Sequence, residues 1–195
     1  MLRIRKLRET DLEALLEFTD REIGLGYFNG AELRIVYERS QSHGHMCSFV
    51  LVDRQSSIHG IRLSYPPGRW DAGKGLGLRP DLWPYPLQAT AYFQSIFLTP
   101  EVQGLGWGGR LSREALAALK RTGAKGVVTH AWKESPHGSS TRYLSKLGFE
   151  TLIEHPEYWR DVPYDCTRCL RPPCLCTAIE MYLDLYLDRN LDSRT

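Results

Sequence analysis

The chain has 195 residues, of which 42% are hydrophobic and 25% are charged, and these values are typical of one globular domain. The formal net charge of +2 is too small to indicate binding to nucleic acid or to an anionic membrane. The sequence shows no pattern of a secretory signal or of a membrane-spanning stretch, so we expect a cytoplasmic, reducing location without disulfides.

The N-terminal part of the chain predicts one strand and two helices. Residues 2–7 alternate apolar and charged side chains, as in a strand with one buried face. Thr10 and Glu13 have the spacing of a capping box, and the apolar residues that follow predict a helix over 11–22. Asn29 is the expected N-cap of a second helix.

Two strands and a long loop are expected next. Residues 47–52 and 58–63 predict a hairpin, because both are rich in branched apolar side chains. Residues 64–89 hold many prolines and glycines and predict a loop that contains Trp70 and Trp83. These aromatic residues fit two interpretations equally well: a surface excursion pinned by its aromatics, or a flap over a substrate pocket.

The centre of the chain predicts a strand, a glycine-rich turn and a helix. Residues 91–98 are aromatic and branched, residues 110–121 have helical apolar spacing, and four glycines lie between the two segments. The start of a helix exposes unpaired N–H groups and partial positive charge, which suit a phosphate group. The turn is therefore a predicted anion site.

The C-terminal third predicts further strands around one short helix. Residues 126–132 read as a strand, 141–147 as a helix and 151–153 as a strand. Residues 177–187 alternate apolar and polar side chains, which predicts an antiparallel strand with one face exposed.

Two common phosphate motifs do not fit the glycine-rich turn. A Walker loop needs Gly-Lys-Ser/Thr, whereas Arg110 follows Gly109. Gly104, Gly106 and Gly109 have the spacing of a dinucleotide fingerprint, but that motif belongs to the first turn of a parallel βαβ unit.

The stretch from Leu98 and Pro100 through Gln103 to Gly108 resembles the pyrophosphate loop of the GNAT superfamily of acyl-CoA-dependent N-acyltransferases. A helix that ends in Gly-Phe, over residues 143–149, resembles a second characteristic piece of that superfamily. The resemblance implies an α/β (α+β) fold with a mixed, mostly antiparallel sheet of about seven strands and about four helices.

The resemblance also implies a function. The chain would be a single N-acetyltransferase domain over 1–195, in which a primary amine of a small molecule or peptide attacks the thioester of acetyl-CoA directly. In the superfamily, two neighbouring strands splay apart beside the loop, and the pantetheine arm of the cofactor pairs with the open edge. The implied cofactor-binding residues are Phe97, Leu98, Gln103, Gly104, Leu105, Gly106, Trp107, Gly108, Gly109 and Arg110.

The expected catalytic residues depart from the superfamily's pattern. Its general acid is commonly a tyrosine at the position of Leu144, whereas Tyr143 lies one residue earlier, rotated by about 100° on a helix. Tyr143 is the candidate acid, or it faces the core. The strand before the loop lacks a carboxylate base, so His130, Glu134 and His137 are candidate bases. The alternative for each is a solvated polar residue.

A cluster of cysteines lies outside the resemblance, in an insertion over 160–176. The cysteines are Cys166, Cys169, Cys174 and Cys176. Four thiolates at this spacing can complete a closed tetrahedral zinc site, which is structural because no position stays open for a substrate. The alternatives are free thiols, a disulfide or an iron–sulfur cluster. Cys47 is alone in a strand and is expected in the core.

Two other functions stay open. A non-catalytic acyl-CoA-binding or sensing domain agrees with the absent tyrosine and carboxylate. A zinc-stabilised interaction module agrees with the cysteines, although the near-neutral charge argues against nucleic acid as its partner. The sequence does not select one amine acceptor, and a homodimer is compatible with it.

Overall fold

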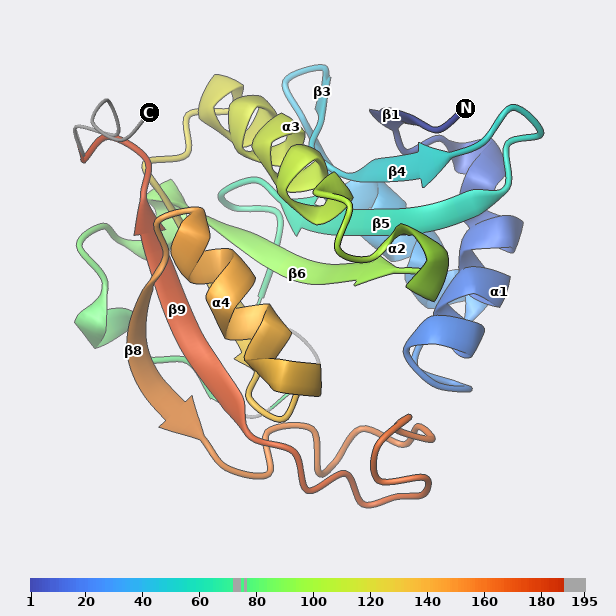
Figure 1. Cartoon of the computed structure of the whole chain (residues 1–195). Helices are drawn as coiled ribbons and strands as arrows, with labels where there is room; N and C mark the ends of the chain where they lie inside the picture. Colours follow the sequence, from blue (N-terminus) through green and yellow to red (C-terminus); the bar gives the residue numbers. More distant parts are fainter. Residues whose placement is uncertain (72–74, 76, 188–195) are drawn as a thin grey trace.

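A seven-stranded sheet forms the centre of the computed structural model, which describes residues 1–71, 75 and 77–187 (Figure 1). The strand order is β1-β4-β5-β6-β7-β9-β8, and neighbouring strands are antiparallel except for β6 and β7. The strands are β1 (Arg3–Lys6), β4 (Phe49–Val52), β5 (Ile58–Tyr65), β6 (Thr90–Leu98), β7 (Gly126–Trp132), β8 (Glu150–His155) and β9 (Ala178–Asp184). A separate hairpin consists of β2 (Gln41–Ser42) and β3 (His45–Met46).

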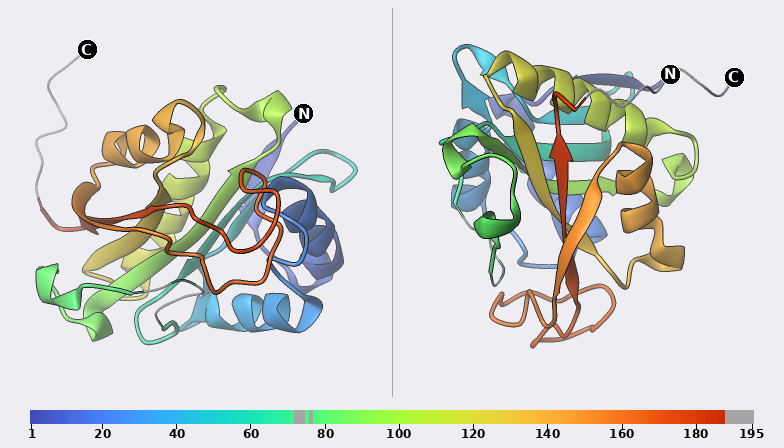
Figure 2. Two further views of the ribbon diagram at one scale, coloured as in Figure 1. Left: turned by 90° about the horizontal axis from the view of Figure 1, so that it is seen from below. Right: turned by 90° about the vertical axis from the view of Figure 1, so that its left-hand side faces the viewer.

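The described α-helices cover both faces of the sheet (Figure 2). Helices α1 (Leu12–Glu22) and α2 (Gly30–Arg39) lie on one face, and α3 (Trp107–Arg121) and α4 (Ser139–Lys146) lie on the other. Each pair contributes apolar side chains to its own buried core. Short 3-10 turns also occur, at Glu9–Asp11, Pro80–Leu82, Leu87–Ala89, Pro100–Val102 and Pro136–Gly138. Among the described helices, none has the length and apolar character to cross a membrane.

The predicted fold class is confirmed, with strand and helix bounds that differ from the predicted ones by a few residues. Asn29 caps α2 as expected, because its side chain accepts the Glu32 N–H at 2.9 Å and the Glu32 carboxylate accepts the Asn29 N–H at 2.9 Å. The hairpin of β2 and β3 was not expected, since strands of two residues carry too little alternation to predict.

The capping box expected at Thr10 and Glu13 is wrong. Asp11 occupies the N-cap position of α1, and its carboxylate accepts the Arg8 backbone N–H at 2.8 Å. The same carboxylate binds the Arg5 guanidinium through two hydrogen bonds, of 2.6 and 2.7 Å. This bidentate ion pair to β1 fixes the start of α1 more firmly than a hydroxyl cap does.

The exposed face expected for the last strand is also wrong. Strand β9 lies between β7 and β8, and all of its residues except the last are buried. Glu180, in its middle, is 0% exposed. Its carboxylate accepts the Trp83 indole N–H at 2.7 Å, the Arg79 backbone N–H at 3.1 Å, and lies 2.7 Å from His155 Nε2. These donors stabilise a carboxylate that burial alone would disfavour.

Two tryptophans tie the long predicted loop to the sheet. The Trp70 indole donates to the Thr90 carbonyl at 2.9 Å, and the Trp83 indole donates to the buried carboxylate on β9. The loop also passes so close to Tyr158 that a Cβ on Gly75 would overlap the phenol ring. These contacts favour the interpretation of a surface excursion pinned by aromatics.

We predict that Trp83→Phe lowers the free energy of unfolding more than Trp70→Phe does. Both tryptophans are buried, at 8% and 9% exposure, and both replacements remove an indole N–H. Trp83 donates to a charged acceptor, so its loss costs about 1.5–3 kcal/mol, against about 0.5–1.5 kcal/mol for the bond from Trp70 to a neutral carbonyl. Urea denaturation measures the loss of unfolding free energy in each variant. A loss for Trp83→Phe that is equal to or smaller than that for Trp70→Phe contradicts the prediction.

Candidate functional site

The sheet opens between β6 and β7. The two strands are paired from Thr90 and Gly126 to Phe93 and Thr129, and no pair follows, although β6 continues to Leu98. Beyond this point β6 remains paired with β5, and β7 remains paired with β9. In Figure 1, β6 runs across the molecule, whereas β9, the partner of β7, is steeply inclined to it. The splay implied by the resemblance is therefore present.

The glycine-rich turn begins where the open edge of β6 ends. The Gln103 side chain donates from Nε2 to the Leu98 carbonyl at 2.9 Å, which holds the turn against the strand. Gly104 and Gly106 have φ angles of 74° and 82°, a region that favours glycine over other residues. Helix α3 then begins at Trp107.

Six consecutive backbone N–H groups, of residues 104–109, donate to no backbone acceptor among the described residues. The flanking groups are used, since Gln103 N–H donates to the Pro100 carbonyl at 3.3 Å and Arg110 N–H to the Gly106 carbonyl at 3.2 Å. The N-terminus of α3 adds partial positive charge. The turn therefore presents a row of free donors that fits an anionic phosphate.

Along β6, the backbone N–H and C=O groups of successive residues are directed alternately toward β5 and toward β7 or the opening. Thr99 N–H donates to the His59 carbonyl at 2.9 Å, so the backbone N–H and C=O groups of Thr99 and Phe97 are directed at β5. The backbone N–H and C=O groups of Ile96 and Leu98 are consequently directed at the opening. The edge available to a ligand is thus carried by these two residues, and the peptide group of Phe97 is directed to the other side.

A buried arginine lies on the face of the sheet that α3 and α4 cover. Arg62 of β5 is 1% exposed, and its guanidinium stacks over the Phe93 ring, with Cζ 4.1 Å from the centroid. It donates from Nε to the Ser112 hydroxyl of α3 at 3.1 Å and from Nη2 to the Tyr143 hydroxyl of α4. The two hydroxyls are also hydrogen-bonded to each other. The candidate acid Tyr143 therefore joins β5, α3 and α4.

The candidate base His130 lies on the opposite face, one residue beyond the last pair of β6 and β7. Its side chain is 2% exposed. The Tyr92 and Tyr158 hydroxyls lie 3.1 and 3.2 Å from Nδ1, and Nε2 lies 3.9 Å from a Glu180 carboxylate oxygen. Burial, together with the neighbouring His155, lowers the pKa of His130 to about 3, so its imidazole is neutral.

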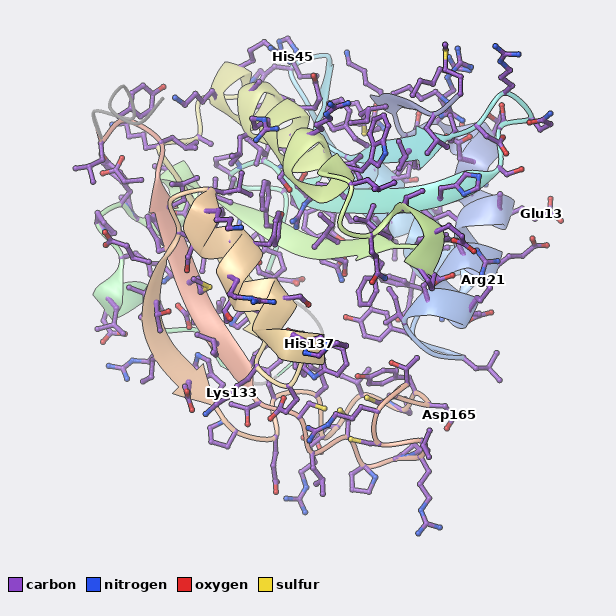
Figure 3. All side chains as sticks on the ribbon, viewed as in Figure 1. Glu13, Arg21, His45, Lys133, His137 and Asp165 are labelled. Carbon is purple, nitrogen blue, oxygen red and sulfur yellow. The ribbon has the colours of Figure 1, made fainter. Side chains whose placement is uncertain are left out.

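The other candidate bases are placed differently. Both oxygens of the Glu134 carboxylate accept the Thr177 backbone N–H, at 3.1 and 3.0 Å, and this links the end of β7 to the start of β9. His137 is exposed and lies at the start of α4 (Figure 3). Neither side chain is directed at the opening by a described contact.

The four cysteines of the insertion come together. Their sulfur atoms all lie within 4.8 Å of one another, and Figure 3 shows sulfur atoms gathered in the loops beside Asp165. The Tyr164 hydroxyl donates to Cys174 Sγ at 3.5 Å, and the Trp132 indole lies beside Cys176, its buried N–H having no other partner among the described residues. Donors directed at sulfur are typical of metal-bound thiolates. The cluster can bind a metal.

Comparison with known proteins places this geometry in context. No family model matches the chain, and no curated protein matches its sequence. Solved structures do match it along nearly its whole length. The chain has the fold of the GNAT N-acetyltransferases.

Three structures illustrate the match to the GNAT fold. One is a Salmonella typhimurium protein described as an acetyltransferase with its cofactor acetyl-CoA, at 18% identity, a TM-score of 0.67, and coverage of 100% of this chain and 99% of that one. The ribosomal-protein-S18-alanine N-acetyltransferase from Escherichia coli matches at 16% identity and a TM-score of 0.64, covering 98% of both chains. An N-acetyltransferase from Staphylococcus aureus Mu50 matches at 19% identity and a TM-score of 0.64, covering 95% of this chain and 99% of that one.

Sequence reasoning missed several residues of this GNAT-fold site. Arg62 could have been noticed, because an arginine in the middle of an apolar strand needs a partner when buried. Glu180 could have been noticed for the same reason, because it is a charged residue in the middle of the apolar last strand. Tyr158 carried none, since its contact with His130, 4.3 Å between ring centroids, depends on a loop without regular structure.

We predict that His130→Gln makes stability less dependent on pH. In the wild type the unfolded histidine takes up a proton near pH 6.5, whereas the folded one does so only near pH 3, so stability falls as the pH drops between these values. The loss amounts to about 1.6 kcal/mol between about pH 6.5 and pH 5, and the glutamine variant lacks it. Urea titrations at both pH values measure the difference.

His137→Gln is the matched control, because that histidine is exposed. Its stability should follow the wild-type pH dependence. If His130→Gln also follows it, the neutral buried imidazole is the wrong description.

Proposed function

We propose that the chain is an N-acyltransferase that moves the acetyl group of acetyl-CoA to a primary amine of a small molecule or peptide. The observation that carries the proposal is the row of free N–H groups at residues 104–109, which lies directly beside the opened edge of β6. The Salmonella typhimurium protein of the same fold was solved with acetyl-CoA as its cofactor, which supports the choice of acyl donor.

In this proposal the pyrophosphate of the cofactor accepts hydrogen bonds from residues 104–109. The Arg110 guanidinium, which lies 4.9 Å from the Trp107 ring, and Arg113, beside Gly109, add positive charge at the same place. The pantetheine arm pairs with the peptide groups of Ile96 and Leu98 and enters the opening between β6 and β7. The thioester then lies close to the last pair of these strands.

The amine attacks the thioester carbon, its nitrogen forms a bond to the acyl group, and the thiolate of coenzyme A leaves. By position, His130 is the candidate to receive the amine proton, because it lies just beyond the last β6–β7 pair. Its pKa of about 3 makes it a weak base at neutral pH, so in this proposal the proton passes along the hydrogen bond between His130 and the Tyr158 hydroxyl, 3.2 Å from Nδ1, and ends on solvent.

A specific observation favours a second function, that of a domain which binds acyl-CoA without transferring the acyl group. The Tyr143 hydroxyl, the candidate acid, is already engaged by Arg62 and Ser112. An assay separates the two functions. Each polyamine, amino acid or peptide of a panel is incubated with the protein and acetyl-CoA, and chromatography measures the coenzyme A that is released. Turnover of an amine supports transfer, whereas tight binding without turnover of any amine supports the sensing function.

We predict that Gly109→Glu weakens acetyl-CoA binding by about tenfold or more, because a carboxylate beside the free N–H groups repels the pyrophosphate. The fold tolerates a side chain here, since a Cβ on Gly109 would meet only the Arg113 guanidinium, at 3.5 Å. Gly109→Gln has nearly the same size without the charge and should bind several-fold better than the glutamate variant. Calorimetric titration gives both constants, and equal values would remove the phosphate site from the turn.

We further propose that the four-cysteine cluster holds a structural zinc ion, with Cys166, Cys169, Cys174 and Cys176 as its ligands. Zinc prefers four thiolates in a tetrahedron, and a closed set of four leaves no position for a substrate. The absence of regular structure over residues 156–177 supports a metal as the group that orders this segment. A reducing compartment such as the cytoplasm would keep the thiols free to bind it.

The zinc proposal predicts about one equivalent of metal in protein purified without added metal. Cys169→Ser should lose most of it, whereas Cys47→Ser should keep it, because Cys47 lies in the other core. Replacement by cobalt should give a thiolate charge-transfer band. Elemental analysis that finds well under one equivalent in the wild type contradicts the proposal.

A further inference from the structure

The cysteine-rich segment, residues 156–177, lies beneath the opening of the sheet and joins its two sides (Figures 1 and 2). Helices α3 and α4, with the free N–H groups, lie on one face of the sheet. In the proposed complex the cofactor's phosphates occupy that side, so we place the acceptor amine on the other face. That face is formed by the loop between α1 and α2, by the aromatic side chains around His130, and by the cysteine-rich segment.

One side of the segment contacts the α1–α2 loop through the backbone. Asp165 N–H donates to the Leu25 carbonyl at 3.2 Å. The two chains approach so closely that a Cβ on Gly24 would overlap the Asp165 carbonyl, and Gly24 has a φ of 147°. Only glycine permits this approach.

Two tyrosines continue the contact from the cysteines to β6. The Tyr164 hydroxyl donates to Cys174 Sγ at 3.5 Å, and its ring meets the Tyr27 ring edge to face, with 4.9 Å between centroids. Tyr27 belongs to the α1–α2 loop. Burial raises the pKa of its phenol to about 12, and side-chain hydrogen bonds with Ser95 of β6 and with Trp159 oppose that rise.

The other side of the segment contacts the end of β7. The Trp132 indole lies beside Cys176, and the Lys133 backbone N–H donates to the Thr177 carbonyl at 3.0 Å. The Cys176 carbonyl accepts the N–H of Tyr158, whose hydroxyl reaches His130. Ligand cysteines are therefore linked to β6 on one side of the opening and to β7 on the other.

We propose that the metal-bound cysteine segment is a wall of the acceptor site, and that the metal controls acceptor recognition by holding the α1–α2 loop against β6. The proposal rests on the acyl transfer proposed above. Without the metal the four thiols no longer fix Tyr164, and the contact of Tyr164 with Tyr27 is lost. Binding of acetyl-CoA is preserved, because the turn at 104–109 is tied to β6 by Gln103 and has no described contact with the segment.

The experiment compares holoprotein with protein treated with a zinc chelator, and follows backbone hydrogen exchange in peptides that cover residues 22–29 and 58–65. We expect exchange at 22–29 to rise by about tenfold or more on metal removal, with little change at 58–65 and with the acetyl-CoA dissociation constant changed less than about threefold. Unchanged exchange at 22–29 overturns the proposal, as does purified protein that contains no metal.

Tyr164→Ala tests the link with the metal in place, in case the metal-free protein unfolds. It should keep its zinc and still show faster exchange at 22–29, whereas Tyr164→Phe, which keeps the ring, should show much less of this effect. Tyr186→Ala is the control, because Tyr186 is 60% exposed and remote from the segment. If Tyr164→Ala leaves 22–29 protected, the segment does not hold the loop.

These results are independent of the proposed acyl transfer. If neither the holoprotein nor any variant binds acetyl-CoA, acyl transfer is rejected. Hydrogen exchange at 22–29 still reports whether the metal stabilises the α1–α2 loop. Once an amine is turned over, metal removal should raise the KM for that amine by about tenfold and leave the acetyl-CoA constant in place. A rise in both constants together would indicate general loosening and would contradict the proposal.

Discussion

The parting of two parallel strands organises this molecule. Strands β6 and β7 share hydrogen bonds as far as Phe93 and Thr129 and then follow different neighbours. Each strand keeps its antiparallel partner, so the separation leaves one edge of β6 and the facing edge of β7 unpaired. An exposed strand edge in a sheet interior is an unsatisfied set of donors and acceptors, and such groups need a ligand or solvent.

The glycine-rich turn adjoins the same edge of β6. It continues β6 directly into α3, so the free N–H groups of residues 104–109 begin where the unpaired strand edge ends. A ligand with a phosphate at one end and amide groups along an arm can satisfy both features at once. Coenzyme A has this chemical pattern, and this agreement, more than the sequence motif, supports an acyl-CoA ligand.

The two faces of the sheet provide different chemistry. On the α3–α4 face, Arg62 holds the hydroxyls of Ser112 and Tyr143 in a buried cluster, and none of its described hydrogen bonds is to a carboxylate. On the α1–α2 face, tyrosines surround His130, and Glu180 lies 3.9 Å from its Nε2. The inserted cysteine segment is attached to this second face, which places the proposed metal site next to the proposed acceptor side rather than next to the glycine-rich turn.

The sequence by itself determined the order of strands and helices, the position of the glycine-rich turn and the clustering of the cysteines, because these depend on local periodicity, on glycine and on short spacing. Only the tertiary structure decided which polar residues are buried and what they contact. Glu180 and Tyr143 show this best: strand alternation and helix rotation place a side chain on a face, but the neighbours of that face come from distant segments. The expected capping box failed because Asp11, at the start of α1, pairs with Arg5 of β1, a contact that depends on how the helix packs beside the strand.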